Sequence, residues 1–139
     1  MSATLDALAK VPMFRDLNHK ALERLEKIAR TRTFNGGDQI VKEGDEGVGF
    51  FMISDGKVEV TRAGTHLASL GSGEFFGEMA LLDNYRRSAT VTAKDPTTCL
   101  AILRSDFIAE LRGNPDLGVE MLALMSRRVR EADERLAHQ

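Results

Sequence analysis

The chain has 139 residues, of which 42% are hydrophobic and 29% charged, a balance that fits one globular domain and argues against extensive disorder. Its 19 basic and 21 acidic side chains give a formal net charge of -2, which excludes a uniformly basic nucleic-acid binder. The single cysteine, Cys99, excludes an intrachain disulfide framework and a cysteine-based zinc site. Without a run of about 18 apolar residues or a secretory signal, the sequence predicts a cytoplasmic protein with no membrane segment.

The first part of the chain, residues 1–30, is expected to be helical. Apolar residues recur at helical spacing from Ala21 to Ala29, and Asn18 precedes them as a candidate N-cap. We expect residues 1–139 to form a single domain that opens with this helical part.

Residues 31–103 carry the pattern of an antiparallel β-structure. Ten of the 12 glycines lie between Gly36 and Gly77, so this part of the chain turns often. Asp55-Gly56 lies between two β-type runs and predicts a hairpin. The spacing of the short strands predicts a mainly β fold, an antiparallel β-roll or jelly-roll-like barrel. The expected strands are Gln39–Val41, Gly49–Ile53, Lys57–Thr61, His66–Leu70, Ser88–Ala93 and Thr97–Leu103. Cys99 falls within the last of these and is expected to be buried.

The last part, residues 104–139, is again expected to be helical. A short helix is predicted from Ser105 to Gly113, and a longer one begins at Asn114-Pro115, a cap followed by proline. The longer helix carries a heptad-like apolar stripe, which could pack against the barrel or against a second copy of the chain. The stripe consists of Leu122, Met125, Val129, Ala132 and Leu136.

The most informative segment begins with Phe75, Phe76 and Gly77. Gly77 permits a sharp turn and a close backbone approach, and Glu78 to Leu82 are good helix formers. A helix that begins here presents unpaired N–H groups and a partial positive charge, which suit a phosphate.

The residues that follow fit the same ligand. Arg87 can donate two hydrogen bonds to the same anion, Ser88 adds a hydroxyl, and Ala89 leaves its neighbouring N–H accessible. Glu78 accepts hydrogen bonds only, so it suits an adjacent pair of hydroxyl groups such as those of a ribose. Together these requirements describe a nucleotide phosphate beside a sugar.

Residues 76–91 resemble the phosphate-binding cassette of the cyclic-nucleotide-binding domain family, with Phe-Gly-Glu-x-Ala-Leu, a five-residue spacer, and Arg-Ser-Ala-Thr-Val. The resemblance extends to Val11–Leu17, Glu43–Asp45 and Ser54–Val58, so it covers essentially the whole chain. It implies a bacterial-type, stand-alone member with a β-roll and C-terminal lid helices. We name residues 76–91 the cassette.

The resemblance also implies a role for each matching residue. Glu78 would accept from the ribose 2′-hydroxyl, and Arg87 would pair with an exocyclic phosphate oxygen. Ser88 would complete the phosphate shell, and a serine here, where members that prefer cGMP often carry threonine, favours cAMP. Phe75 and Phe76 are expected to belong to the barrel core. The predicted ligand-binding residues are Phe76, Gly77, Glu78, Met79, Ala80, Leu81, Arg87, Ser88 and Ala89.

We therefore expect a sensor for a cyclic nucleotide, favouring cAMP, that repositions its C-terminal helix on binding and has no enzymatic activity or cofactor. His19, His66 and His138 are scattered, so no metal site is expected. Nothing resembles a DNA-binding module, and the chain stops at Gln139. The alternatives are a regulatory fragment of a larger channel, kinase or transferase, or a ligand-blind dimerisation scaffold.

Two further expectations concern the last helix. Its apolar stripe favours a homodimer through this helix. Arg127, Arg128 and Arg130 are expected either to form a solvated face or to place one side chain over the purine as a lid.

Overall fold

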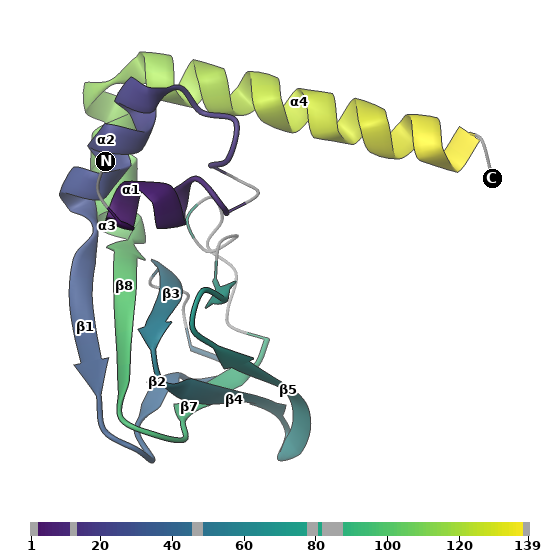
Figure 1. Ribbon diagram of the computed structural model, residues 1–139. Helices are drawn as coiled ribbons and strands as arrows, with labels where there is room; N and C mark the ends of the chain where they lie inside the picture. Colours follow the sequence, from purple (N-terminus) through teal and green to yellow (C-terminus); the bar gives the residue numbers. More distant parts are fainter. Residues whose placement is uncertain (1–2, 12–13, 46–48, 78–80, 82–87, 138–139) are drawn as a thin grey trace. The chain divides into compact units, whose positions relative to one another are not determined.

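The computed structural model describes residues 3–11, 14–45, 49–77, 81 and 88–137. The chain divides into two compact units (Figure 1). One contains residues 28–108 and is mainly β-structure, and the other contains residues 1–27 and 109–139 and is helical. Each unit is described separately below.

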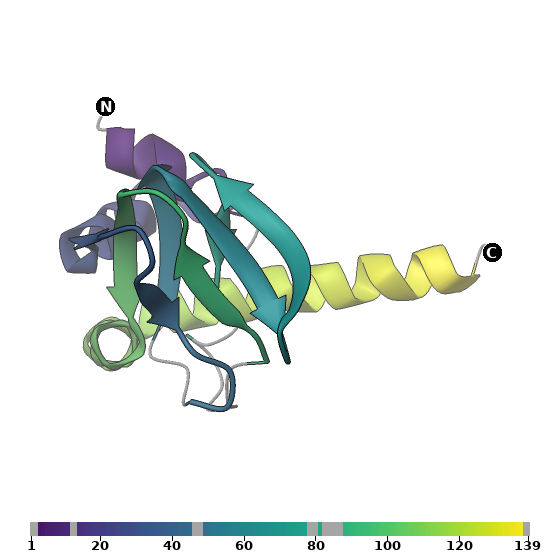
Figure 2. The same ribbon diagram turned by 90° about the horizontal axis from the view of Figure 1, so that it is seen from below.

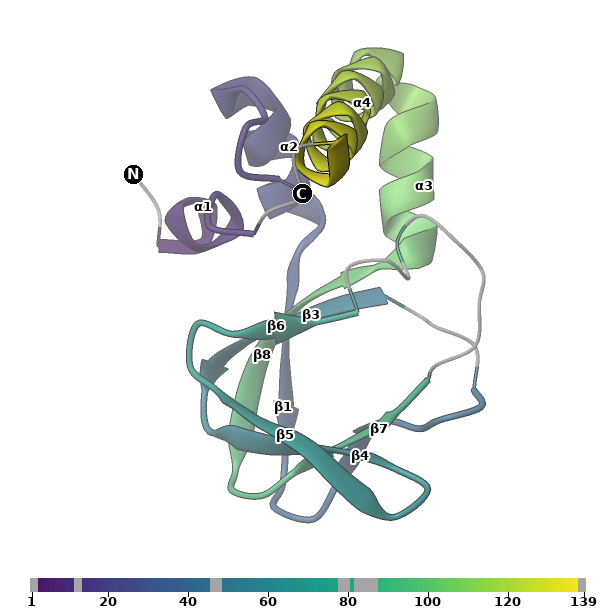
Figure 3. The same ribbon diagram turned by 90° about the vertical axis from the view of Figure 1, so that its right-hand side faces the viewer.

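The β unit is an antiparallel roll, which confirms the predicted fold class. Its two four-stranded sheets have the orders β1-β8-β3-β6 and β2-β7-β4-β5. Figure 3 shows the two sheets facing each other across the interior of the roll. The strands are β1 (Arg30–Phe34), β2 (Gln39–Val41), β3 (Gly49–Asp55), β4 (Lys57–Arg62), β5 (Thr65–Gly71), β6 (Phe75–Phe76), β7 (Thr90–Ala93) and β8 (Thr97–Leu103).

The core of the roll lies between the two sheets. Phe51 and Ile53, two residues apart on β3, are buried and belong to one apolar cluster, as expected for alternate positions on one face of a strand. Val58 and Val91 join it from the opposite sheet, and Cys99 from β8 is fully buried, as predicted.

The turn at Asp55-Gly56 is not the predicted hairpin. β3 pairs with β6 and β8, whereas β4 pairs with β5 and β7, so this turn carries the chain from one sheet to the other. Gly56 has φ +108°, and a Cβ at this position would lie 2.7 Å from the carbonyl oxygen of Pro96. Glycine is therefore needed for both its conformation and its lack of a side chain. A true hairpin joins β4 and β5 through Ala63-Gly64.

The helical unit contains α1 (Ala3–Leu8), α2 (His19–Ile28) except for its last residue, and α4 (Pro115–Ala137). The boundary between the units falls within α3 (Arg104–Gly113). Asn18 is the N-cap of α2, as predicted: its Oδ1 accepts a hydrogen bond of 2.9 Å from the Ala21 N–H. None of the helices in the part of the chain that the structure describes is long and apolar enough to cross a membrane.

Helix α4 is one uninterrupted helix of 23 residues (Figure 2). Its buried residues are spaced four and three apart, at Leu117, Met121 and Leu124. The predicted heptad-like stripe occupies other positions: Leu122, Val129 and Leu136 are 63–68% exposed, and Met125 is half-buried.

Candidate ligand-binding site

The cassette begins where β6 ends. Phe76 pairs with Phe51 on β3, and the two rings are stacked with centroids 5.2 Å apart. Phe76 is half-buried against the core cluster, so its ring belongs to the core, as predicted. Gly77 follows with φ 82°, a left-handed conformation that favours glycine and turns the chain out of the strand.

Leu81 ties the middle of the cassette to the protein interior. Its side chain is fully buried, with 0% exposure. Burying a leucine side chain contributes about 2 kcal/mol relative to leaving it exposed. The predicted contacts Glu78, Met79, Ala80 and Arg87 lie outside the described residues.

The end of the cassette enters β7. Ser88 is exposed, Ala89 is half-buried, and Thr90 is buried as the first residue of the strand. Because β6 and β7 belong to different sheets, the cassette is one of the connections between the two sheets. Five predicted residues (Phe76, Gly77, Leu81, Ser88 and Ala89) therefore lie on one connection, and of these Ser88 is exposed.

Two hydrogen bonds link the end of the cassette to neighbouring turns and a third joins those turns to each other; sequence reasoning missed all three. Arg62 Nε donates to the Ser88 carbonyl oxygen at 2.9 Å. The Ala63 N–H donates to Glu43 Oε1 at 2.9 Å, and the Glu43 N–H donates to Thr90 Oγ1 at 3.0 Å. The only sequence signal was the turn chemistry around these residues, which does not reveal their partners.

Each of the described histidines lies beside a glutamate at the surface. His66 Nδ1 lies 2.8 Å from Glu59 Oε1, and His19 Nε2 lies 3.1 Å from Glu23 Oε1. The hydrogen bond with His66, with a smaller contribution from the nearby Lys94 charge, lowers the pKa of Glu59. Within residues 3–11, 14–45, 49–77, 81 and 88–137, no three His, Cys, Asp or Glu side chains form a group that could hold a metal.

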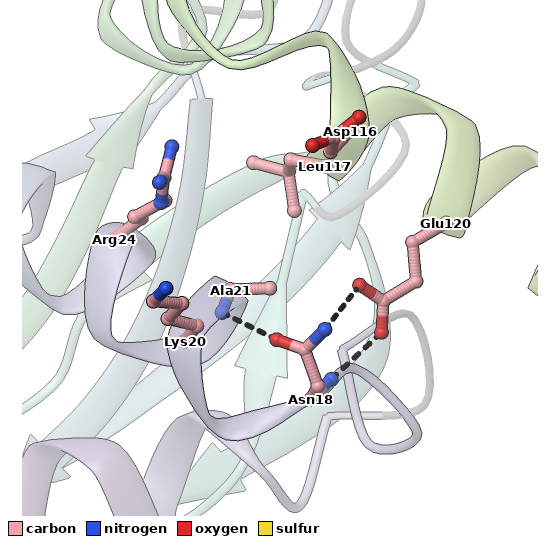
Figure 4. Close-up of a pocket in the computed structure, with 7 residues that line it drawn as sticks. All are labelled: Asn18, Lys20, Ala21, Arg24, Asp116, Leu117 and Glu120. Carbon is pink, nitrogen blue, oxygen red and sulfur yellow. Dashed lines mark hydrogen bonds between the residues drawn. The ribbon is translucent and has the colours of Figure 1, made fainter.

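A polar hollow of about 170 Å³ lies in the helical unit, between α2 and the start of α4 (Figure 4). Asn18 closes one side, because its backbone N–H and its Nδ2 donate to the two carboxylate oxygens of Glu120 at 2.7 and 3.0 Å. Ligand pockets usually measure about 300–1,000 Å³, so this hollow is too small for a nucleotide. Its lining joins two helices and belongs to the architecture of this unit.

The arginines of α4 differ in exposure. Arg127 and Arg130 are exposed, which fits a solvated face. Arg128 is half-buried, and its Nη2 is buried without a hydrogen-bond partner among the described residues. The lid role of any of these arginines stays a prediction.

The structure thus shows an antiparallel roll in which a connection that begins at Gly77 and contains the buried Leu81 joins β6 to β7. Residues 31–114 match the model of the family described as "Cyclic nucleotide-binding domain", and the chain belongs to this family.

Curated relatives fall into several classes of protein. The chain is 37% identical over 129 residues to the "Cyclic AMP receptor protein" of Thermus thermophilus, covering 88% of this chain and 59% of that protein. It is 32% identical over 127 residues to a "cGMP-dependent protein kinase" of Eimeria tenella, covering 91% of this chain and 12% of that protein. The chain thus spans less than two thirds of the length of either relative.

A solved structure matches most of both chains. It is the N-terminal domain of a transcriptional regulator from Streptomyces coelicolor A3(2), with 29% identity and a TM-score of 0.82. The match covers 93% of this chain and 96% of that one.

Proposed function

We propose that the protein is a sensor for a cyclic nucleotide, that cAMP is its preferred ligand, and that the cassette is the binding site. The observation that carries the proposal is the complete cassette pattern at residues 76–91, located on the connection between β6 and β7. The relative named for cyclic AMP supports the choice of cAMP, as does Ser88. The cGMP-dependent kinase makes cGMP the competing ligand.

Each cassette residue has a proposed role. The N–H groups near Gly77, Met79 and Ala80 hold the phosphate, as a helix N-terminus does. Arg87 pairs with an exocyclic phosphate oxygen, and Glu78 accepts from the ribose 2′-hydroxyl. Phe76 and Leu81 anchor the two sides of the turn, and Ser88 with the Ala89 N–H completes the phosphate shell.

The proposed output is a population shift without catalysis or cofactor. Ligand orders the cassette, and α4 takes a different position in the bound state, which a partner then reads. The buried, reduced Cys99 suits a cytoplasmic protein. A regulatory part of a larger channel, kinase or transferase would use the same binding step.

The exposed stripe on α4 supports a homodimer through this helix. Leu122, Val129 and Leu136 recur every seven residues and are 63–68% exposed, so a second copy would bury them as a coiled-coil seam. Sedimentation equilibrium tests this assignment. The proposed dimer requires wild type to be dimeric and Val129→Glu to be monomeric, and a monomeric wild type contradicts it.

Calorimetric titration with cAMP, cGMP and cyclic di-GMP tests the binding proposal. We expect saturable binding of one nucleotide per chain, with cAMP the strongest. Tighter binding of cGMP than of cAMP would support the proposed sensor function but overturn the preference for cAMP that was inferred from Ser88. Silence from all three, in a folded sample free of co-purified nucleotide, would favour the ligand-blind dimerisation scaffold that the α4 stripe could support.

Substitution of Arg87 tests the site itself. Arg87→Ala should weaken cAMP binding by about 2–4 kcal/mol, the scale of a buried ion pair that loses one partner. Arg86→Ala is the matched control, because it removes the same charge one residue out of register and should leave the affinity within about twofold. Equal losses in the two variants would refute the assignment of Arg87.

A further inference from the structure

The β4–β5 hairpin is hydrogen-bonded to the end of the cassette. Arg62, the last residue of β4, donates from Nε to the Ser88 carbonyl oxygen at 2.9 Å, across 26 positions of sequence. β4 and β7 are neighbours in one sheet (Figure 3). Thr61 on β4 pairs with Thr90, the first residue of β7, so the register brings the next residue, Arg62, to the end of the cassette.

The Ser88 carbonyl and the Ala89 N–H belong to the same peptide group. The described residues contain no cis peptide bond, so this group is planar and trans, and its C=O and N–H point in opposite directions. A donor that holds the Ser88 oxygen therefore also sets the direction of the Ala89 N–H. A guanidinium on the carbonyl side further polarises the group and makes the N–H a stronger donor.

Arg62 is itself held by the turn that follows it. Ala63 has φ 50°, a left-handed conformation that is unfavourable for a residue with a Cβ. Its N–H donates to Glu43 Oε1 at 2.9 Å, and the Glu43 N–H donates to Thr90 Oγ1 at 3.0 Å. With the bond from Arg62 to Ser88, these contacts close a ring around the end of the cassette. The ring ties the hairpin tip and the peptide group to each other.

We propose that Arg62 is a positioning residue for the ligand. It holds the Ser88–Ala89 peptide group in the orientation in which the Ala89 N–H meets the phosphate. This inference rests on the proposed function, because it names a residue that acts through the cassette without touching the nucleotide. Because Arg62 orients the Ala89 N–H before the nucleotide binds, less conformational entropy is lost on binding.

Two neutral substitutions separate the hydrogen bond from the charge. Arg62→Gln retains an N–H donor on the atom that follows Cδ, where arginine carries Nε, whereas Arg62→Met places no donor there. Both remove one positive charge, so a difference between them reports the donor alone. Arg32→Gln on β1 is the control for charge loss, because Arg32 is also exposed and lies in the other sheet. All three variants change exposed residues and should leave the fold intact, which far-UV circular dichroism checks.

Calorimetry with cAMP is the first measurement. We expect Arg62→Met to bind about fivefold more weakly than wild type, the effect of one lost hydrogen bond. Arg62→Gln should stay within about twofold of the Arg32→Gln control. Equal affinities for Arg62→Met and Arg62→Gln would overturn the proposal, because the donor would then be irrelevant. If wild type binds none of the cyclic nucleotides, the proposed function fails and the inference fails with it. If wild type binds and Arg62→Met binds equally well, only the inference fails.

A spectroscopic readout distinguishes positioning from a general loss of structure. The ¹⁵N resonance of an amide responds to a hydrogen bond on the carbonyl of the same peptide group. In the free protein we expect the Ala89 resonance to move in Arg62→Met and to return towards its wild-type position in Arg62→Gln. An Ala89 resonance that is the same in Arg62→Met as in wild type would overturn the proposal.

Discussion

Replacing Leu81 by alanine tests whether the middle of the cassette is held by its own buried side chain. Leu81 is fully buried, whereas its neighbours in the cassette are expected to face the ligand. Fully buried leucines lose about 3 kcal/mol on truncation to alanine, from lost transfer free energy and the cavity left behind. We expect Leu81→Ala to lower the free energy of unfolding by about this amount. Leu67→Ala on β5, at a residue 48% exposed, is the control and should change it by no more than about 0.5 kcal/mol.

The same variant should weaken ligand binding. If the cassette detaches while the roll stays folded, the ligand must restore the lost stability of about 3 kcal/mol when it binds. Because each 1.4 kcal/mol corresponds to a tenfold change in affinity, binding can weaken by up to about 150-fold. We expect cAMP binding to weaken by at least about tenfold. Urea titration followed by circular dichroism measures the stability, and calorimetry measures the affinity.

Two results would refute this reasoning about Leu81. A loss of stability below about 1 kcal/mol would mean that the side chain does not hold the segment. A full loss of stability with unchanged affinity would mean that the cassette is ordered by the ligand alone.

Two further predictions concern the β-roll. Ala63→Gly should raise the free energy of unfolding by about 0.5–1 kcal/mol, because glycine adopts the left-handed φ of 50° without strain, at some cost in chain entropy. A lower free energy of unfolding for this variant in urea titration would contradict the prediction. Burial raises the pKa of the Cys99 thiol from 9.0 to about 11, so the unfolded chain loses its thiol proton first as the pH rises. The contribution of Cys99 is therefore complete well below pH 9.0 and is lost as the pH rises through about 11. Between pH 9.0 and pH 11 we expect the free energy of unfolding to fall by about 2 kcal/mol more in wild type than in Cys99→Ala; equal pH dependence in the two proteins would contradict the prediction.

Elements with strong local patterns were predictable from the sequence. The strands Gln39–Val41 and Thr97–Leu103 have the predicted bounds, and Asn18 caps α2 as expected. The signal for each is local, a short β-type run for the strands and a capping side chain for the helix, although the strands themselves form by pairing with distant residues. Strand β1 (Arg30–Phe34) was missed because its arginines and threonines are exposed and show no apolar alternation. It becomes a strand by pairing with β8, which is a tertiary interaction.

The hairpin predicted at Asp55-Gly56 was wrong for a related reason. Its local sequence specifies a tight turn, and a tight turn is what forms, but the partners of the flanking strands depend on the whole sheet. The turn residue Gly56 lies against Thr97, which is 41 positions further along the chain. A signal of a few residues cannot distinguish a hairpin from a change of sheet.

The sequence by itself determined the family, the helix–roll–helix order and the cassette, because these depend on residue types at fixed spacing. Only the tertiary structure decided that Leu81 is buried and that Arg62 holds the Ser88 carbonyl. That hydrogen bond joins residues 26 positions apart, and the one between Ala63 and Glu43 joins residues 20 apart. Such pairs follow from strand order and register, which arise when two sheets bury a common core and which no local pattern encodes.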